Sequence, residues 1–135
     1  MNAPDRLADL FGPVIHAYTR ADAIADEVLH DVSTDATEAG FRIPVALTAA
    51  AWVDAVEWDE EHRALQDERG RLWDVLTMAR LAASRASSAD TVSFQVLRVP
   101  NTARATRPRL TDLVLHIGPG DQGKPVVTIM LPGED

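Results

Sequence analysis

The chain has 135 residues, of which 46% are hydrophobic and 25% charged, as expected for one soluble globular domain spanning residues 1–135. Its formal net charge of −8 is divided unevenly, because residues 1–68 hold 15 acidic and 4 basic residues (−11) whereas residues 69–135 hold 6 acidic and 9 basic residues (+3). The lack of cysteine excludes disulfides and thiolate metal ligands, no apolar run approaches the roughly 18 residues of a membrane-spanning helix, and the acidic balance argues against general binding of nucleic acid.

The beginning of the chain predicts a strand followed by a helix. Residues 1–12 are expected to form a loose lead-in, and the alternating VIHAY at 14–18 favours a short strand. Thr19 and Asp22 have the spacing of a capping box, which marks a helix start. The helix that follows is expected to present one apolar face, at i, i+4 and i+8, made of Ile24, Val28 and Val32.

Shorter elements are predicted in the middle of the chain. Residues 35–39 can form one helical turn, which Gly40 ends. Residues 41–48 are expected to be extended because of the proline within them. Thr48 can then cap a second helix over about residues 49–58, on which Asp54 and Glu57 are expected to point away from the side of Trp52 and Val56.

The second half predicts one helix and then strands. The segment QDERGR at 66–71 indicates a turn with Gly70 at positive φ, and the apolar stripe after it indicates a helix over about residues 72–86. Alternating or β-branched runs then predict strands at 91–99, 113–117 and 125–131. Helices followed by strands favour an α+β fold, with about three helices packed on one face of a small antiparallel sheet of about three or four strands.

A literal G-x-G-x-x-G at Gly118, Gly120 and Gly123 raises the question of a dinucleotide-binding loop. Such a loop needs a helix directly after it, whose N-terminus receives the pyrophosphate. Here the following residues are VVTIML, which favour a strand, and Asp121 would place a negative charge beside the phosphates. We therefore interpret this segment as the turn of a C-terminal β-hairpin.

Two charged segments are candidate binding sites. Arg98, Arg104, Arg107 and Arg109 form a basic loop without acidic residues, which can contact phosphates or can pair with the acidic half of the chain. No aromatic residue is available there for base stacking, so we do not expect nucleic acid as the main partner. The acidic run Asp59, Glu60 and Glu61 is either a solvated helix face or a docking surface, with Trp58 as an exposed anchor.

The other tryptophans and the histidines suggest no further site. Trp52 and Trp73 are expected to anchor the core. The four histidines lack the spacing of a metal site, so no metal is predicted.

Three stretches of the chain resemble a known family. They are FGPVIHAYTRADAIAD, GRLWDVL, and RPRL followed by IGPGDQGKPVVTIMLPGED. They resemble a domain of unknown function found in short uncharacterised bacterial proteins, which are carried on plasmids and integrative elements, often near anti-restriction genes. The resemblance runs from about residue 10 to the end of the chain. It implies a role in the life of mobile elements and no particular catalytic residue.

The stretch VIHAYTRADAIADEVL is also similar to the opening of ADP-ribosyltransferase-type folds. That resemblance implies NAD as a cofactor, with His16 orienting the ribose and Tyr18 or Thr19 nearby. It also implies that Glu134, after the last predicted strand, is the catalytic acid.

The sequence therefore leads to one main hypothesis and two alternatives. The main hypothesis is a cytoplasmic, non-enzymatic interaction protein of a mobile genetic element, without a cofactor, that covers a basic surface of a host protein as an anti-CRISPR or anti-restriction protein would. The alternatives are an NAD-using transferase and a nucleic-acid-binding accessory protein that uses the loop from Arg98 to Arg109. An exposed sheet edge would also permit a homodimer.

Overall fold

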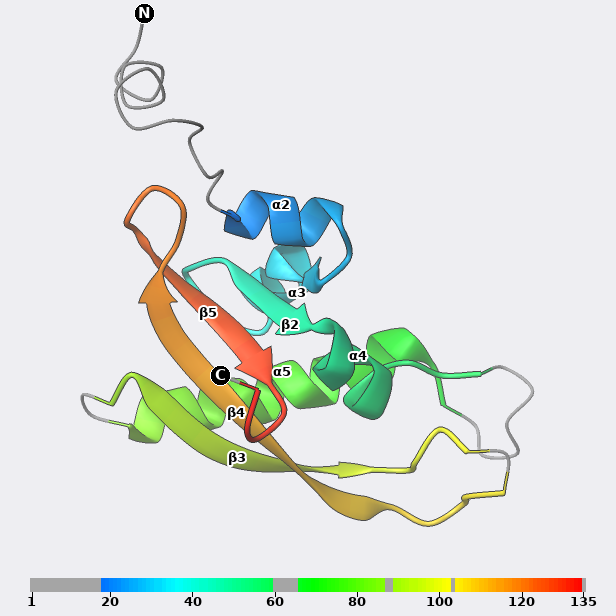
Figure 1. The fold of residues 1–135 in the computed structure, drawn as a ribbon. Helices are drawn as coiled ribbons and strands as arrows, with labels where there is room; N and C mark the ends of the chain where they lie inside the picture. Colours follow the sequence, from blue (N-terminus) through cyan, green and yellow to red (C-terminus); the bar gives the residue numbers. More distant parts are fainter. Residues whose placement is uncertain (1–17, 60–65, 87–88, 103, 135) are drawn as a thin grey trace, which may run out of the picture.

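A computed structural model describes residues 18–59, 66–86, 89–102 and 104–134. The described chain forms an α+β fold, as predicted, with a curved sheet and one long helix behind it (Figure 1). In chain order the elements are α2 (Arg20–Ala25), β1 (Leu29–Asp31), α3 (Ser33–Glu38), β2 (Val45–Thr48), α4 (Ala49–Ala55), α5 (Glu68–Arg85), β3 (Thr91–Arg98), β4 (Arg109–Pro119) and β5 (Pro125–Met130). The predicted strand at 14–18 lies outside the described residues.

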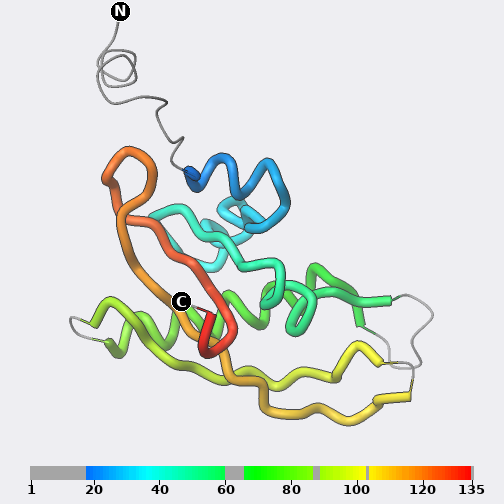
Figure 2. Tube along the Cα trace, in the orientation of Figure 1, coloured from blue at the N-terminus to red at the C-terminus, as the bar shows by residue number. Residues whose placement is uncertain are grey.

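The sheet is larger than predicted and it is mixed. Its five strands have the order β1-β2-β5-β4-β3. The pair β2 and β5 is parallel, and the other three pairs are antiparallel. The expectation of an antiparallel sheet of three or four strands was wrong because β1 has only three residues, too few for a visible alternation, and because the last strand inserts beside β2 (Figure 2).

The hydrophobic core lies between α5 and the sheet face that is turned toward it. Side chains that alternate along β2, β4 and β5 meet the apolar stripe of α5, and α3 and α4 add smaller residues. The fully buried side chains at the centre are Val45, Leu47, Val75, Leu76, Leu113, Leu115, Val127 and Ile129. These three helices thus share one face of the sheet, as predicted.

Helix α2 lies against the opposite face of the sheet, which was not predicted. The Arg20 guanidinium donates to Thr128 Oγ1 and to the Val127 carbonyl, both at 2.8 Å. The Thr128 side chain points away from the core, since its neighbours Val127 and Ile129 point into it. Burial lowers the pKa of Arg20, while the carboxylates of Asp31 and Asp121 act in the other direction.

The predicted start of α2 is confirmed, and its predicted length is wrong. Thr19 Oγ1 accepts from the Asp22 amide, and the Asp22 carboxylate accepts from the Thr19 amide, which completes the capping box. The helix nevertheless ends at Ala25, because Glu27 adopts a φ of 61° and redirects the chain into β1. Val28 is consequently exposed instead of continuing an apolar face.

The start of α5 differs from the prediction for a similar local reason. Asp67, and not a turn at Gly70, begins the helix: its carboxylate accepts from the Gly70 amide at 2.6 Å. An aspartate whose side chain bonds an amide in the first turn is a strong N-cap. Gly70 therefore lies within the helix and does not have the positive φ predicted for it. Gly40 does have a positive φ, 106°, and it ends α3 as expected.

The glycine-rich segment forms the predicted hairpin turn between β4 and β5. The Gly120 amide donates to the Lys124 carbonyl at 2.7 Å, and Gly123 has a φ of 79°. The Asp121 carboxylate accepts from the amides of Arg20 and Ala21, at 2.7 and 3.0 Å. The turn therefore supplies a negative group to the N-terminus of α2.

Candidate functional site

An open hollow of about 580 Å³ lies between α4 and the segment that follows β3. Its apolar floor is formed by Ala50, Val53 and Leu131, and carboxylates stand on the α4 side. The complete lining is Ala49, Ala50, Val53, Asp54, Glu57, Pro100, Asn101, Thr102 and Leu131. Acidic and apolar groups side by side suit a long basic side chain, which has an apolar stem and a charged end.

The sequence of α4 explains why these side chains face the hollow. Thr48 caps the helix, because its Oγ1 accepts from the Ala51 amide at 3.1 Å. Ala51 and Ala55 are fully buried at i and i+4, so the opposite side of the helix faces solvent. That side presents Asp54 and Val53, which is 54% exposed, and the exposed Glu57 follows shortly after the end of the helix.

The end of the described chain forms another wall of the hollow. The Glu134 carboxylate accepts from the Thr48 hydroxyl at 2.7 Å and from the Leu131 amide at 2.6 Å. These two bonds hold the residues after β5 against the start of α4. Leu131 is thereby kept at the floor of the hollow.

Two buried arginines fix the distance between α4 and the end of β3. Arg71 is 1% exposed and donates from Nε to the Val56 carbonyl at 2.9 Å and from Nη1 to the Val99 carbonyl at 2.8 Å. Arg98 donates from Nη1 to the carbonyls of Ala55 and Arg71, at 3.4 and 3.1 Å. We name these two residues the arginine clasp. It joins the last residues of α4 to the segment that forms the far wall of the hollow.

The surroundings of the arginine clasp both oppose and stabilise its two positive charges. Burial lowers the pKa of Arg71 to about 10, with a further contribution from the like charge of Arg98. The Arg71 guanidinium lies 4.7 Å from the ring centroid of Trp58, a favourable cation–π contact. Its Nη2 is buried and has no hydrogen-bond partner within the described residues. Arg98 is compensated by an ion pair with Asp74 at 2.7 Å.

The structure corrects the prediction for Arg98. It was expected to be part of a phosphate-binding loop, but it is only 4% exposed and belongs to β3. Its side chain continues the inward alternation of Phe94 and Val96. Arg104, Arg107 and Arg109 are exposed, as expected. They lie on residues 99–102 and 104–110, which together we call the β3–β4 arm.

The structure also corrects the predicted exposure of two tryptophans. Trp58, expected as an exposed anchor of the acidic surface, is 7% exposed because the chain turns inward after α4 and places its ring under Arg71. Trp73, expected in the core, is 45% exposed, because the buried stripe of α5 falls on Leu72, Val75 and Leu76. Trp52 stacks on His30 with 4.6 Å between the ring centroids.

Asp59, the first residue of the predicted acidic surface, lies next to the hollow. Asp59 is exposed, and its amide donates to Asn101 Oδ1 at 3.1 Å, which links the end of α4 to the far wall. Glu60 and Glu61 lie outside the described residues. The carboxylates of the hollow itself, Asp54 and Glu57, were not singled out as site residues, although the helical pattern placed them on the solvent side.

Tyr18 and Glu134, two residues of the NAD-dependent alternative, lie near opposite ends of β5. The Tyr18 hydroxyl donates to Asp26 Oδ2 at 2.8 Å, and this hydrogen bond raises the pKa of Tyr18. Tyr18 lies just before the start of α2, which contacts the turn that precedes β5. Glu134 lies beyond the opposite end of β5, after its last residue. His16 lies outside the described residues, and the NAD-dependent role stays a prediction.

Two other kinds of site are absent from the described ranges. Their His, Asp and Glu side chains form no group of three that could hold a metal ion. No helix there combines the length and the hydrophobicity needed to cross a bilayer.

The fold and the hollow define a small α+β domain with a mixed sheet and an acidic, partly apolar surface beside α4. The sequence profile of a family of unknown function, DUF6573, matches residues 9–135, and the chain belongs to this family. No curated protein and no solved structure matches the chain. The resemblance drawn from three stretches of sequence is thus confirmed as far as a domain of unknown function.

Proposed function

We propose that this protein acts by binding a basic segment of another protein in the hollow beside α4. The observation that carries this proposal is the arrangement of Asp54 and Glu57 next to the apolar surface of Val53 and Leu131. A lysine or arginine of the partner can lay its stem on the apolar floor and direct its charge to the carboxylates. Contacts of this kind combine burial with charge-assisted hydrogen bonds.

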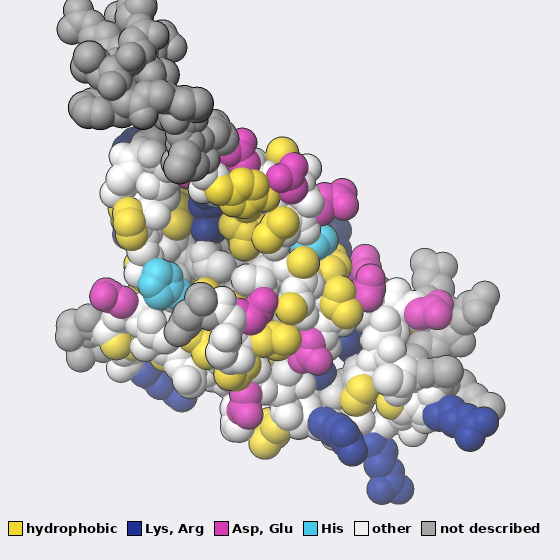
Figure 3. Space-filling view, in the orientation of Figure 1, with side chains coloured by type: hydrophobic (Ala, Val, Ile, Leu, Met, Phe, Trp, Pro, Cys, Tyr) yellow, Lys and Arg dark blue, Asp and Glu magenta, His cyan; other side chains and the backbone are white. Residues whose placement is uncertain are grey.

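The charge distribution of the whole surface supports the same kind of partner. Carboxylates are spread over the part of the molecule built from α2, β2 and α4, whereas basic side chains project mainly from the β3–β4 arm (Figure 3). In the described residues up to Asp59 the basic side chains are Arg20 and Arg42, and Arg20 is bonded to β5. A surface with this excess of negative charge attracts basic proteins over a distance and orients them.

The proposal extends to a role in a mobile genetic element. Restriction and CRISPR nucleases hold DNA or RNA through clusters of lysine and arginine, which bind phosphates. A small acidic protein that covers such a cluster competes with the nucleic acid. We propose that the hollow serves this purpose and that the protein protects incoming DNA in a bacterial host.

Protection of incoming DNA can be measured as the transformation efficiency of a plasmid that a restriction or CRISPR system attacks. We expect the protein to raise this efficiency and the double variant Asp54→Asn/Glu57→Gln to lose the effect. The control Glu38→Gln/Asp90→Asn removes the same charge from exposed positions outside the hollow and should keep it. Absence of protection against both systems, together with no partner in a cross-linked pull-down from host lysate, would exclude the proposal.

The exposure of the β3–β4 arm favours one other candidate function. Arg104, Arg107 and Arg109 are all exposed, and no acidic residue occurs between Arg98 and Asp112. Such an arm can contact phosphates of a nucleic acid. Affinity for duplex DNA should then fall steeply with salt and weaken in Arg107→Ala/Arg109→Ala. Affinity that is absent, or independent of salt, would rule this candidate out.

A further inference from the structure

The outer edge of β3 carries backbone groups that the sheet does not use. In the described part of the chain β3 is the last strand of the sheet. The Asp90 carbonyl accepts from the Ile117 amide at 2.7 Å, so every second residue from Asp90 onward directs its backbone groups toward β4. The backbone groups of the intervening residues point outward, and these residues are Thr91, Ser93, Gln95 and Leu97.

This edge also lacks the features that keep an edge strand from pairing. The segment TVSFQVL at 91–97 contains no charged residue and no proline, and it extends through nearly the whole strand. Exposed edges of this length usually carry lysine, proline or a bulge, because an open edge is a template for another strand. We infer that this edge has a partner strand.

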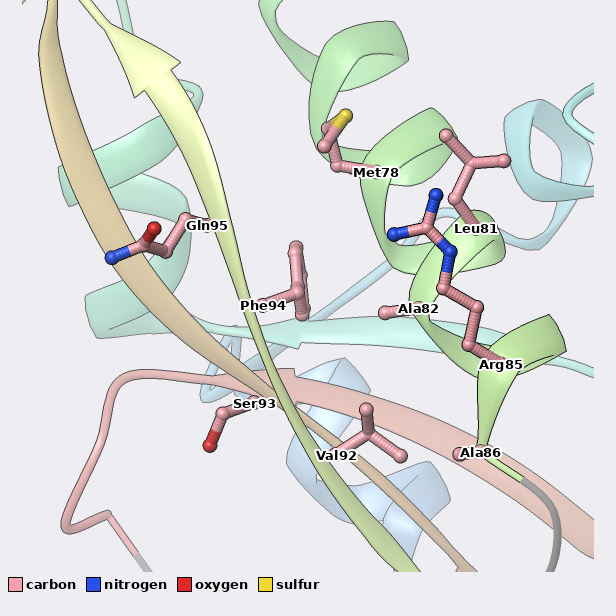
Figure 4. A pocket seen from close by; sticks show the side chains of 9 residues that line it. All are labelled: Met78, Leu81, Ala82, Arg85, Ala86, Val92, Ser93, Phe94 and Gln95. Carbon is pink, nitrogen blue, oxygen red and sulfur yellow. The ribbon is translucent and has the colours of Figure 1, made fainter.

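Between β3 and α5 runs a groove made of two adjoining hollows, of about 390 and 350 Å³, which share Met78 and Gln95. In the first hollow, Val92 and Phe94 point from β3 toward α5, while Ser93 and Gln95 point to the other side of the strand (Figure 4). From α5 the groove receives Met78 and Leu81, which are large apolar side chains exposed to solvent.

We propose that the groove and the edge of β3 bind a second copy of this chain, related by a two-fold axis at Phe94. The two β3 strands then pair antiparallel. Ser93 lies opposite Gln95 of the partner subunit, and Thr91 lies opposite Leu97 of the partner subunit. This register uses all four residues whose backbone groups point outward, and it joins the two sheets into one.

The charges at the two ends of the groove favour a second copy over an unrelated strand. Asp74 lines one end beside Leu97, where its exposed carboxylate also pairs with Arg98, and Arg85 lines the other end, beside Val92. The residues 74, 78, 81 and 85 lie on one side of α5, because their spacing follows the helical repeat. A two-fold axis across the middle of the groove places Asp74 opposite the partner's Arg85 and brings the exposed apolar side chains of both helices together.

The first test is the molecular mass in solution. Sedimentation over a wide range of protein concentration should show about 29.4 kDa, which is 2 × 14.7 kDa. Gln95→Pro removes an outward amide while leaving the backbone hydrogen bonds to β4 intact, and it should weaken dimerisation at least about tenfold. Gln95→Ala is the matched control, because it removes the same side chain, and its bond to Asp112, but keeps the amide.

The second test identifies which residues of the two β3 strands lie opposite each other in the dimer. The natural chain contains no cysteine, so Ser93→Cys and Gln95→Cys each introduce a single thiol. Residues directly opposite each other in a hydrogen-bonded antiparallel pair have Cα atoms about 5.5 Å apart, which permits a disulfide. We expect a cross-linked dimer when the two variants are mixed and oxidised, and much less from either variant alone.

Three results would overturn the inference. They are a wild-type protein that remains monomeric at every concentration, a Gln95→Pro variant that dimerises as well as Gln95→Ala, or cross-linking that does not depend on mixing the two cysteine variants. Circular dichroism of Gln95→Pro verifies that the fold is kept. If a monomeric wild type instead binds an extended peptide in the groove, the partner is another protein and the dimer is excluded.

Discussion

Arg98 donates a hydrogen bond to the backbone carbonyl of Arg71 at 3.1 Å, and both arginines are buried in the interior of a protein of 135 residues. Their mutual repulsion contributes to the lowered pKa of Arg71. What keeps both in place is the set of carbonyl groups at the ends of α4 and β3, which would otherwise be buried without donors. The clasp thus satisfies the backbone where a helix and a strand end together.

We predict that Arg71→Met strongly destabilises the protein. The substitution leaves the buried carbonyls of Val56 and Val99 without a donor, and each unpaired group costs about 1–3 kcal/mol. The free energy of unfolding, measured with urea, should fall by about 2–4 kcal/mol. Arg69→Met, an exposed position on the same helix, should change it by less than about 0.5 kcal/mol. Equal effects of the two variants would contradict the role of the clasp.

The titration of Tyr18 provides a second prediction. Its hydroxyl donates to Asp26, and this bond and the negative charge of Asp26 raise the pKa of Tyr18 above the ordinary value of 10.0. The hydrogen bond is fully present at a pH below the ordinary pKa of tyrosine, and it is lost as the pH rises through the raised pKa. Because Tyr18 is the only tyrosine, its ultraviolet absorbance measures this pKa directly. Asp26→Asn should lower it, and an unchanged pKa would mean that the bond is not formed in solution.

The contact between Asp121 and α2 provides a third prediction. The Asp121 carboxylate accepts from two amides at the start of α2, in the manner of an N-cap supplied by a distant turn. Asp121→Ala should cost about 1 kcal/mol, as the loss of a helix cap does. Hydrogen exchange of the Arg20 and Ala21 amides should become faster. Gln122→Ala, in the same turn, is the control and should leave both amides protected.

Two glycines with positive φ should differ in their tolerance of a side chain. At Gly40, with φ 106°, a Cβ atom would lie 3.1 Å from Arg80 Nε, whereas at Gly123, with φ 79°, nothing lies within 4 Å. Gly40→Ala should therefore cost about 2 kcal/mol and Gly123→Ala about 1 kcal/mol. Thermal unfolding of the two variants measures the difference. A larger loss for Gly123→Ala would show that crowding by Arg80 is unimportant.

The features that could be predicted are those that depend on neighbouring residues. The caps at Thr19 and Thr48, the end of α3 at Gly40 and the turn of the C-terminal hairpin each follow from a few adjacent side chains, and the structure confirms them. The same reasoning placed Asp54 on the solvent side of its helix. Local chemistry was sufficient at these positions because the partners lie within one or two turns.

The features that were missed depend on contacts between distant segments. Arg98 belongs to a segment whose composition is typical of a binding loop. Its place in the interior depends on hydrogen bonds to backbone carbonyls of distant residues, Ala55 and Arg71. The hollow itself combines α4 with residues 100–102 and Leu131, which no local pattern brings together. Trp58 was placed on the surface because it precedes the acidic run, whereas its ring is buried under Arg71, which lies 13 residues further along the chain.

The position of β5 has a consequence for the order in which the protein can assemble. β5 lies between β2 and β4, yet it follows the other four described strands along the chain. Until residues 125–130 have emerged, β1–β2 and β3–β4 are two separate hairpins with no shared hydrogen bonds, and neither hairpin is stable alone in water. Until β5 joins them, the two hairpins leave apolar core side chains exposed, and such exposure makes a folding chain prone to aggregation.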